Sequence, residues 1–262
     1  GHPQALTPHM DKLAARGTLF RNAHCQAPLC NPSRSSLLTG LRPTTTGIYG
    51  LAPGIRDVER TKRHVTLPQA FQVAGYHTFT CGKVYHDGSI KPADRPREFA
   101  TWGPSPGSGK PKERIARLPG TPHPLMDWGP FPEKDADAAD YQIATAAVEA
   151  VAAAPAEKPF FIACGFSNPH LPFVAPKRYW DLYDPATIQL ADNPFPPRNA
   201  PPFAATSWGE LRAYVGIPAK GPLSDDQARQ MIHGYWAATS YIDAQIGRLL
   251  DTLRELDKDD NT

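Results

Sequence analysis

The chain has 262 residues, of which 28 are basic, 26 are acidic and 40% are hydrophobic, and its formal net charge is +2. This length and hydrophobic content suffice for one large α/β domain, and the balanced charge gives no support to nucleic-acid binding. No apolar run approaches the roughly 18 residues that a membrane span needs, and the 30 prolines favour long ordered loops over a helical bundle.

The four cysteines are too few and too irregularly spaced for a disulfide framework. Cys25 and Cys30 form a Cys-x4-Cys pair, but no second cysteine pair follows, so a zinc site is not favoured. Cys81 and Cys164 lie in apolar runs, and we interpret both as small core residues.

The first elements in chain order are a helix and a strand. Thr7 and Pro8 provide an N-cap and a first-turn proline, and they predict a helix that ends at Gly17. The alternating residues 18–24 then predict a strand that leads toward Cys30.

Residues 30–40 read Cys-Asn-Pro-Ser-Arg-Ser-Ser-Leu-Leu-Thr-Gly. Pro32 is suited to the first position of a helix that stops at Gly40. A group at position 30 would then face backbone N–H donors at the positive end of a helix dipole, which is a ready site for a tetrahedral oxyanion. The alternative interpretation is a buried cysteine before a capped helix.

A helix–glycine–strand unit follows a predicted turn at residues 42–47 and a predicted surface loop at 50–64. Residues 66–74 predict a helix that stops at Gly75, and residues 76–81 predict a strand that runs into Gly-Lys-Val-Tyr-His at 82–86. This order is typical of a sheet with parallel strands, which place ligands beyond their carboxyl ends.

Residues 87–130 differ in composition from the rest of the chain. Twelve of the thirty residues from 101 to 130 are Gly or Pro, so we expect no regular element there. Such a stretch is typical of a binding loop or lid, with a disordered insertion as the alternative. Trp102 and Trp128 at its two ends favour packing.

The second half of the chain continues the α/β pattern. Residues 134–153 predict an alanine-rich helix, and the apolar run 159–166 predicts a buried central strand. Residues 176–183 predict a short helix, residues 184–205 a proline-rich loop, and Ser224 the cap of a final helix. No linker divides the chain. An α/β fold would place another strand after that helix, so we expect the chain to be a fragment.

Three chemically active side chains follow predicted strands. Lys83 and His86 lie three positions apart, and His170 lies between prolines after the apolar run. Taken singly, a lysine is usually solvated and a histidine usually structural. Together with Arg34 and the helix start at Cys30, they predict a site for a tetrahedral anion.

Residues 30–40 resemble the signature Cys-x-Pro-Ser-Arg-x-x-Leu-Leu-Thr-Gly of type I sulfatases, in the alkaline-phosphatase-like superfamily, and the order of motifs is most similar to the iduronate-2-sulfatase branch. The other matching stretches are residues 7–14, 82–86, 168–173 and 240–243. The resemblance implies an α/β sandwich with a mostly parallel central sheet flanked by helices, truncated at both ends. Residues 1–262 would be a partial catalytic domain, with the loops 87–130 and 184–222 bordering the substrate site.

The resemblance also implies the chemistry. A maturation enzyme would convert Cys30 to formylglycine, whose hydrate is both the nucleophile and a metal ligand. One hydrate oxygen would attack sulfur and expel the alcohol, and the other would help to eliminate sulfate. Arg34 would stabilise the hydrate, Lys83 and His86 would contact the sulfate and the hydrate, and His170 would bind sulfate and donate a proton to the leaving oxygen.

The chain departs from the family in its metal ligands. The family binds Ca²⁺ through an Asp-Asp pair on a first strand and an Asp followed by His or Asn on a late strand, and neither is present. Asp225-Asp226 and Asp259-Asp260 are interpreted as solvated. A hard dication needs several oxygen ligands. We therefore expect the remaining calcium ligands to lie outside residues 1–262, and we expect the isolated chain to be inactive.

The function implied is hydrolysis of sulfate esters, on a sulfated sugar or a glycosaminoglycan-type glycan. Two alternatives stay open: a phosphomonoester or phosphonate ester hydrolase of the same superfamily, and a catalytically silent module that binds sulfated glycans. A cysteine-nucleophile hydrolase is less supported because no activating base is identified for an unmodified Cys30. The expected partners are the sulfated carbohydrate and the maturation enzyme, with no nucleic acid and no membrane span. By resemblance, we expect a periplasmic, extracellular or lysosome-like location.

Overall fold

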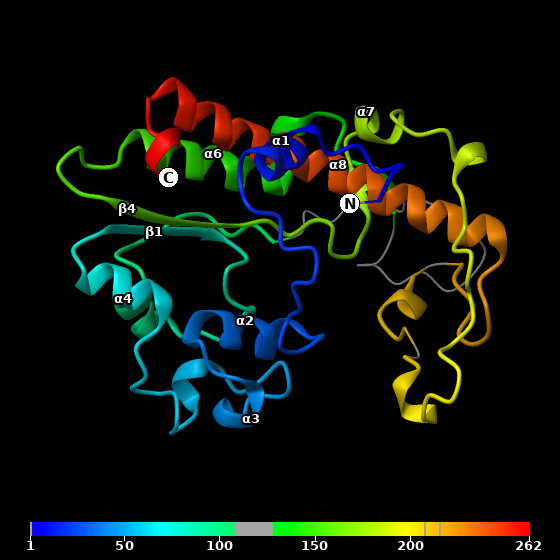
Figure 1. Cartoon of the computed structure of the whole chain (residues 1–262), viewed down its shortest axis with the longest axis horizontal. Coiled ribbons are helices and arrows are strands. Elements are labelled where there is room, and N and C mark those ends of the chain that lie inside the picture. Colours follow the sequence, from blue (N-terminus) through cyan, green and yellow to red (C-terminus); the bar gives the residue numbers. More distant parts are fainter. Residues whose placement is uncertain (1, 108–127, 207, 215) are drawn as a thin grey trace. The chain divides into compact units, whose positions relative to one another are not determined.

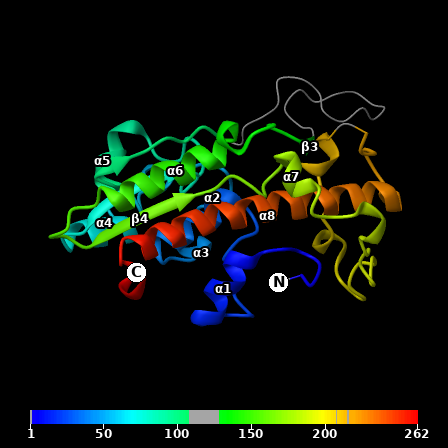
Figure 2. The ribbon, with the colours of Figure 1, turned by 90° about the horizontal axis from the view of Figure 1, so that it is seen from above.

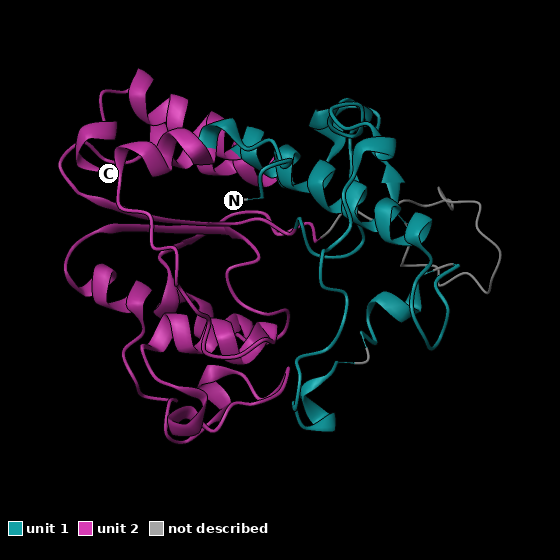
Figure 3. Cartoon of the chain, turned by 45° about the vertical axis from the view of Figure 1, so that its right-hand side comes forward, with its two compact units in different colours: residues 1–9, 108–141, 168–245 teal, residues 10–107, 142–167, 246–262 magenta. Residues whose placement is uncertain are grey.

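The computed structural model describes residues 2–107, 128–206, 208–214 and 216–262. Contacts divide the chain into two compact units (Figure 3). Unit 1 comprises residues 1–9, 108–141 and 168–245, and unit 2 comprises residues 10–107, 142–167 and 246–262. That residues 1–262 form one partial catalytic domain stays a prediction.

Unit 2 contains a parallel three-stranded sheet in the order β2-β1-β4. Strand β1 (His77–Gly82) pairs with β4 (Phe160–Gly165) over six residues, and its other edge pairs with β2 (Thr101–Trp102). The parallel sheet is therefore confirmed. The predicted strand at 159–166 is also present, but it is not a buried central strand. It lies at one end of this sheet with all six residues half-buried, because β1 is its one neighbour among the described strands.

Helices cover both faces of this sheet (Figures 1 and 2). Side chains alternate across a strand, and Phe79 and Cys81 accordingly pack against Ile143 and Ala147 of α6 (Ala139–Ala152). On the other face, Phe161 stacks on Phe71 of α4 (Leu67–Val73) at 4.2 Å between ring centroids. Phe161 also packs against a hydrophobic cluster on this face, which consists of Leu38, Ile48, Ile55, Tyr85, Ile90 and Phe99.

Unit 1 is built around a shorter parallel pair and aromatic packing. Strand β3 (Gly129–Pro130) pairs with β5 (Val174–Ala175), which leads into α7 (Lys177–Trp180). The long helix α8 (Asp225–Glu255) contributes Trp236, which packs with Tyr183 and Ile188. No helix in the described ranges has the length and apolarity of a membrane span.

The remaining helices are short. The α-helices are α1 (Pro8–Arg16), α2 (Cys30–Thr39), α3 (Pro43–Thr46), α4 (Leu67–Val73) and α5 (Arg95–Glu98). The 3-10 helices are η1 (Ile55–Asp57), η2 (Pro92–Asp94), η3 (Asp135–Asp137), η4 (Pro185–Thr187), η5 (Pro202–Ala204), η6 (Leu211–Ala213) and η7 (Asp259–Asn261).

Several predicted elements require correction. Residues 18–24 form no strand: no described strand pairs with them, and Leu19 and Phe20 are exposed. The predicted turn at 42–47 contains the short helix α3. The predicted helix at 176–183 is shorter than expected and consists of α7 alone. The helix predicted from residue 134 begins at Ala139, after the 3-10 helix η3.

The predicted loops contain more structure than expected. Ile55 and Arg56 are buried, so residues 50–64 are not a surface loop. Strands β2 and β3 form at the two ends of 101–130, where no regular element was predicted. Residues 108–127 of that stretch lie outside the described residues.

Candidate active site

Cys30 is the first residue of α2, and the preceding Leu29 is extended. The helix therefore begins two residues earlier than predicted, with Pro32 at its third position and not its first. Pro32 has no N–H, and the N–H of Ser33 donates to Leu29 O at 3.1 Å. The first turn thus offers an anion fewer N–H donors than the sequence suggested. The predicted stop is confirmed: Gly40 ends the helix at φ 70°.

The buried side chain of Asn31 fixes this end of α2. Its amide nitrogen donates to Gly50 O at 3.0 Å and to Pro53 O at 2.9 Å. Asn31 is 1% exposed. The sequence reasoning did not single out this residue, because the two carbonyls that it binds lie about twenty positions downstream.

Arg34 joins α2 to the segment after β1. Its Nη1 donates to Lys83 O and, at 3.0 Å, to Val84 O. Partial burial lowers the pKa of Arg34 from its ordinary 12.5, and the nearby Cys30 and Asp87 side chains act in the opposite direction. A guanidinium remains cationic at neutral pH in proteins. The structure therefore links Arg34, one turn after Cys30, to the backbone at Lys83, while the catalytic roles of these residues stay predictions.

Two facing glycines shape the start of the Lys83 segment. Gly82 and Gly165 are register partners at the carboxyl ends of β1 and β4, and Gly82 has φ 67°. The N–H of Lys83 donates to Gly165 O at 2.6 Å. A Cβ on Gly165 would lie 2.5 Å from Lys83 O and 2.7 Å from Val84 N, so glycine is required for this crossing.

His86 is half-buried at the far end of the same segment. Its carbonyl oxygen accepts hydrogen bonds from the N–H of Ser89 at 2.9 Å and from Ser89 Oγ at 2.7 Å. His86 also lines a cleft of about 380 Å³ beyond the ends of β1 and β2, whose other walls include Tyr85, Arg95 and Trp102. Lys83 and His86 therefore share one anchored segment next to an open cleft.

His170 belongs to unit 1, in the loop between β4 and β5. Its Nδ1 lies 2.8 Å from Leu171 O, and because a carbonyl oxygen can only accept, Nδ1 carries the proton in this contact. Its Nε2 lies 3.5 Å from Glu210 Oε1. That His170 acts with the four candidate residues of unit 2 stays a prediction.

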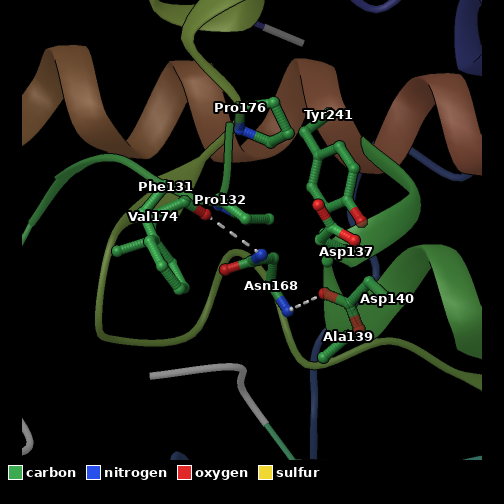
Figure 4. Close-up of a pocket in the computed structure, with 10 residues that line it drawn as sticks. Phe131, Pro132, Asp137, Ala139, Asp140, Asn168, Val174, Pro176 and Tyr241 are labelled. Atoms are coloured by element: carbon green, nitrogen blue, oxygen red, sulfur yellow. Dashed lines mark hydrogen bonds between the residues drawn. The ribbon is translucent and has the colours of Figure 1, made fainter. Parts of the chain in front are cut away.

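The loop that carries His170 is held at Asn168 (Figure 4). The N–H of Asn168 donates to Asp140 Oδ2 at 2.9 Å, and its side-chain amide donates to Val174 O at 3.2 Å. Both contacts border a small cavity of about 20 Å³, which Tyr241 also lines. Sequence reasoning missed Asp140, which is 2% exposed and lies 28 positions before Asn168.

The described part of the chain does not provide a calcium site. It contains no group of three or more His, Cys, Asp or Glu side chains that could hold a metal ion. Asp225 and Asp226 lie exposed at the start of α8, and Asp259 forms an ion pair with Arg16 at 3.3 Å. The residues present therefore do not fit a calcium ion by themselves, and we assign no chemical step to one.

Comparisons with known proteins agree on one family. The family model described as "Sulfatase" matches residues 1–262. A sulfatase of Formosa agariphila is 35% identical over 275 residues, covering 95% of this chain and 50% of that protein. Human iduronate 2-sulfatase is 33% identical over 275 residues, covering 98% of this chain and 48% of that protein. The chain spans about half the length of these curated relatives.

Solved structures confirm the predicted fold class. The phosphonate monoester hydrolase from Silicibacter pomeroyi superposes with a TM-score of 0.71 at 21% identity, covering 99% of this chain and 56% of that chain. The fold is the predicted alkaline-phosphatase-like α/β fold, with a parallel sheet flanked by helices.

Proposed function

Because this chain belongs to the sulfatase family, we propose that the protein hydrolyses sulfate esters with a nucleophile made from Cys30. One observation carries the proposal. Cys30 begins α2, and Arg34 one turn later is hydrogen-bonded to the backbone of the segment that bears Lys83 and His86. This arrangement supports the proposal, because it links a cation one turn after Cys30 to the segment that follows β1, and cations stabilise developing negative charge.

We further propose that Cys30 is converted to formylglycine by a maturation enzyme. Cys30 is half-buried and forms no disulfide, which is compatible with modification. A hydrated aldehyde supplies one hydroxyl that attacks sulfur and a second that helps to eliminate sulfate, which a thiol cannot do. In this proposal the half-buried guanidinium of Arg34 stabilises the negative charge at position 30.

The other candidate residues receive roles consistent with their contacts. Lys83 and His86 contact the sulfate from the segment that Arg34 and Gly165 hold in place. His170 binds sulfate and donates a proton to the leaving oxygen. Since its Nδ1–H is committed to Leu171 O, the proton transfer uses Nε2.

The proposed substrate class is a sulfated carbohydrate. Its support is the 33% identity to a human protein named iduronate 2-sulfatase. The loops 87–130 and 184–222 border the substrate in this proposal and decide which sugar is accepted. An exported location, which the resemblance implies for a glycan sulfatase, is part of the same proposal.

The test uses protein expressed from the complete gene in its native host. Mass spectrometry of the peptide that contains Cys30 should show the roughly 18 Da loss of thiol-to-aldehyde conversion. The protein should hydrolyse 4-nitrophenyl sulfate faster than 4-nitrophenyl phosphate. Cys30→Ala should abolish both reactions, whereas Cys25→Ala, which changes an exposed cysteine, should not.

Two results would contradict the proposal. An unmodified Cys30 together with no hydrolysis of either ester would favour a module that binds sulfated glycans. Faster hydrolysis of the phosphate ester, or of a phenylphosphonate ester, would favour the phosphorus-ester alternative. The two results are distinct because only the first leaves the protein without catalysis.

A further inference from the structure

A buried ion pair in unit 2 is hydrogen-bonded to Tyr85 of the candidate catalytic segment. Arg56 in η1 and Glu98 at the end of α5 are joined by Nε of Arg56 to Oε1 of Glu98 at 2.6 Å and by a second bond from Nη2. Their side chains are 3% and 0% exposed. We propose that this pair positions Lys83 and His86 through Tyr85, an inference that rests on the proposed function of those residues.

The guanidinium of Arg56 is fixed on all sides. Its Nη1 donates to the carbonyl oxygens of Thr61, Lys62 and His64 at 3.2, 3.3 and 2.8 Å. Its Nη2 also donates to Gln69 Oε1 at 2.8 Å. The planar, multiply bonded guanidinium gives the carboxylate of Glu98 one well-defined position.

The second oxygen of Glu98 reaches the candidate catalytic segment. Glu98 Oε2 accepts hydrogen bonds from Tyr85 Oη at 2.7 Å and from Thr66 Oγ1 at 2.6 Å. Burial and the neighbouring carboxylate both raise the pKa of Tyr85, so its hydroxyl stays protonated and donates. Tyr85 lies between Val84 and His86, and it is 8% exposed.

Every residue of the segment 83–86 therefore has its own anchor. Gly165 O binds the N–H of Lys83, Arg34 binds the carbonyls of Lys83 and Val84, and Ser89 binds the carbonyl of His86. Tyr85 differs from the others because its side chain is the anchored group, held by the fully buried carboxylate of Glu98. A shift of its ring would displace both neighbours, and misplacement of a catalytic group by about 1 Å can cost about 100-fold in rate.

A buried ion pair alone is weak support for a stabilising role, because desolvation offsets much of the attraction. The positioning role is separable from stability by comparing two donors to the same oxygen. Tyr85→Phe removes the hydroxyl that belongs to the segment. Thr66→Val removes the hydroxyl of the residue that precedes α4. The backbone N–H of Thr66 also donates to Gln69 Oε1 at 3.0 Å, and this contact is kept in the variant.

The experiment measures kcat, KM and the urea midpoint of both variants in protein from the complete gene, with 4-nitrophenyl sulfate as the probe. Tyr85→Phe should lower kcat by about tenfold or more, as expected for a displaced catalytic group. Thr66→Val should lower the urea midpoint at least as much and leave kcat within about twofold, because it touches no residue of the segment. Equal losses of kcat in the two variants would overturn the proposal.

Amide hydrogen exchange gives a reading that does not depend on activity. Exchange in the peptide that spans residues 83–86 should accelerate in Tyr85→Phe and not in Thr66→Val. Unchanged exchange and unchanged kcat in Tyr85→Phe would show that Glu98 is structural only. If the wild-type protein hydrolyses no sulfate ester, the proposed function fails, while the exchange measurement still decides whether Glu98 positions the segment.

Discussion

Gly165 accepts a hydrogen bond from the backbone N–H of Lys83 at 2.6 Å, at the point where the chain leaves β1 and crosses the end of β4. The crossing is so close that a Cβ at position 165 would lie 2.5 Å from Lys83 O. The backbone of a candidate catalytic lysine is therefore placed by a residue that has no side chain.

We expect Gly165→Ala to displace the Lys83 segment. Overpacking of this kind typically costs about 1–3 kcal/mol of stability, and the shift should also lower the rate of sulfate ester hydrolysis. Urea unfolding and steady-state kinetics measure the two effects. Gly17→Ala is the control, because its Cβ would meet Leu13 O at an ordinary 3.4 Å. Wild-type kinetics in Gly165→Ala would contradict the requirement for glycine.

Arg34→Lys tests geometry separately from charge. A lysine keeps the cation but lacks the planar fork with which Nη1 holds the carbonyls of Lys83 and Val84. We expect kcat/KM for an aryl sulfate to fall by about 100-fold, in line with lost positioning. Arg42→Lys, at an exposed position three residues beyond the end of α2, should leave kcat/KM unchanged. Retention of full activity in Arg34→Lys would show that charge alone suffices.

Arg56→Ala should be severely destabilising. It leaves the fully buried carboxylate of Glu98 without its cation, and breaking a buried pair in this way typically costs about 3–5 kcal/mol. Arg97→Ala is the matched control, because its ion pair with Asp94 at 3.6 Å is partly exposed to solvent and should contribute about 0.5 kcal/mol or less. The free energy of unfolding in urea measures both. Similar losses in the two variants would argue against the special role of Arg56.

Alkaline pH should weaken the fold through Tyr179. Burial, together with a hydrogen bond to Asp135, raises the pKa of Tyr179 from 10.0 to about 12. Since the folded state holds this proton more tightly than the unfolded state, its contribution is complete below pH 10 and is lost as the pH rises toward 12. The stability difference between wild type and Tyr179→Phe should be constant from pH 7 to 9. Above pH 10 this difference in the free energy of unfolding should change by up to about 1.4 kcal/mol per pH unit. A stability difference that stays constant up to pH 12 would contradict the assignment.

Elements with local signals were predicted well. Helix α1 ends at Arg16, next to the predicted stop at Gly17, and α8 begins at Asp225 directly after Ser224. The N–H of Gln227 donates to Ser224 Oγ at 3.2 Å, which is the capping contact that the sequence indicated. Capping and glycine stops involve residues within a few positions of each other, so a pattern in the chain is enough to locate them.

Elements that depend on a distant partner were predicted poorly. Residues 18–24 alternate like a strand, yet no described strand pairs with them, and the apolar run 159–166 lies at one end of its sheet. A strand requires a neighbour for its backbone hydrogen bonds. Residues outside the segment determine whether a neighbouring strand is available to pair with it.

The sequence by itself determined the family signature at residues 30–40, the parallel α/β pattern and the five candidate residues Cys30, Arg34, Lys83, His86 and His170. Only the tertiary structure decided how the Lys83 segment is held. Arg34 reaches across 49 positions to Lys83, and Glu98 reaches 42 positions back to Arg56. Buried polar groups form hydrogen bonds with whichever groups the fold places next to them. Because these partners can be far apart in the sequence, no periodic pattern along the chain predicts them.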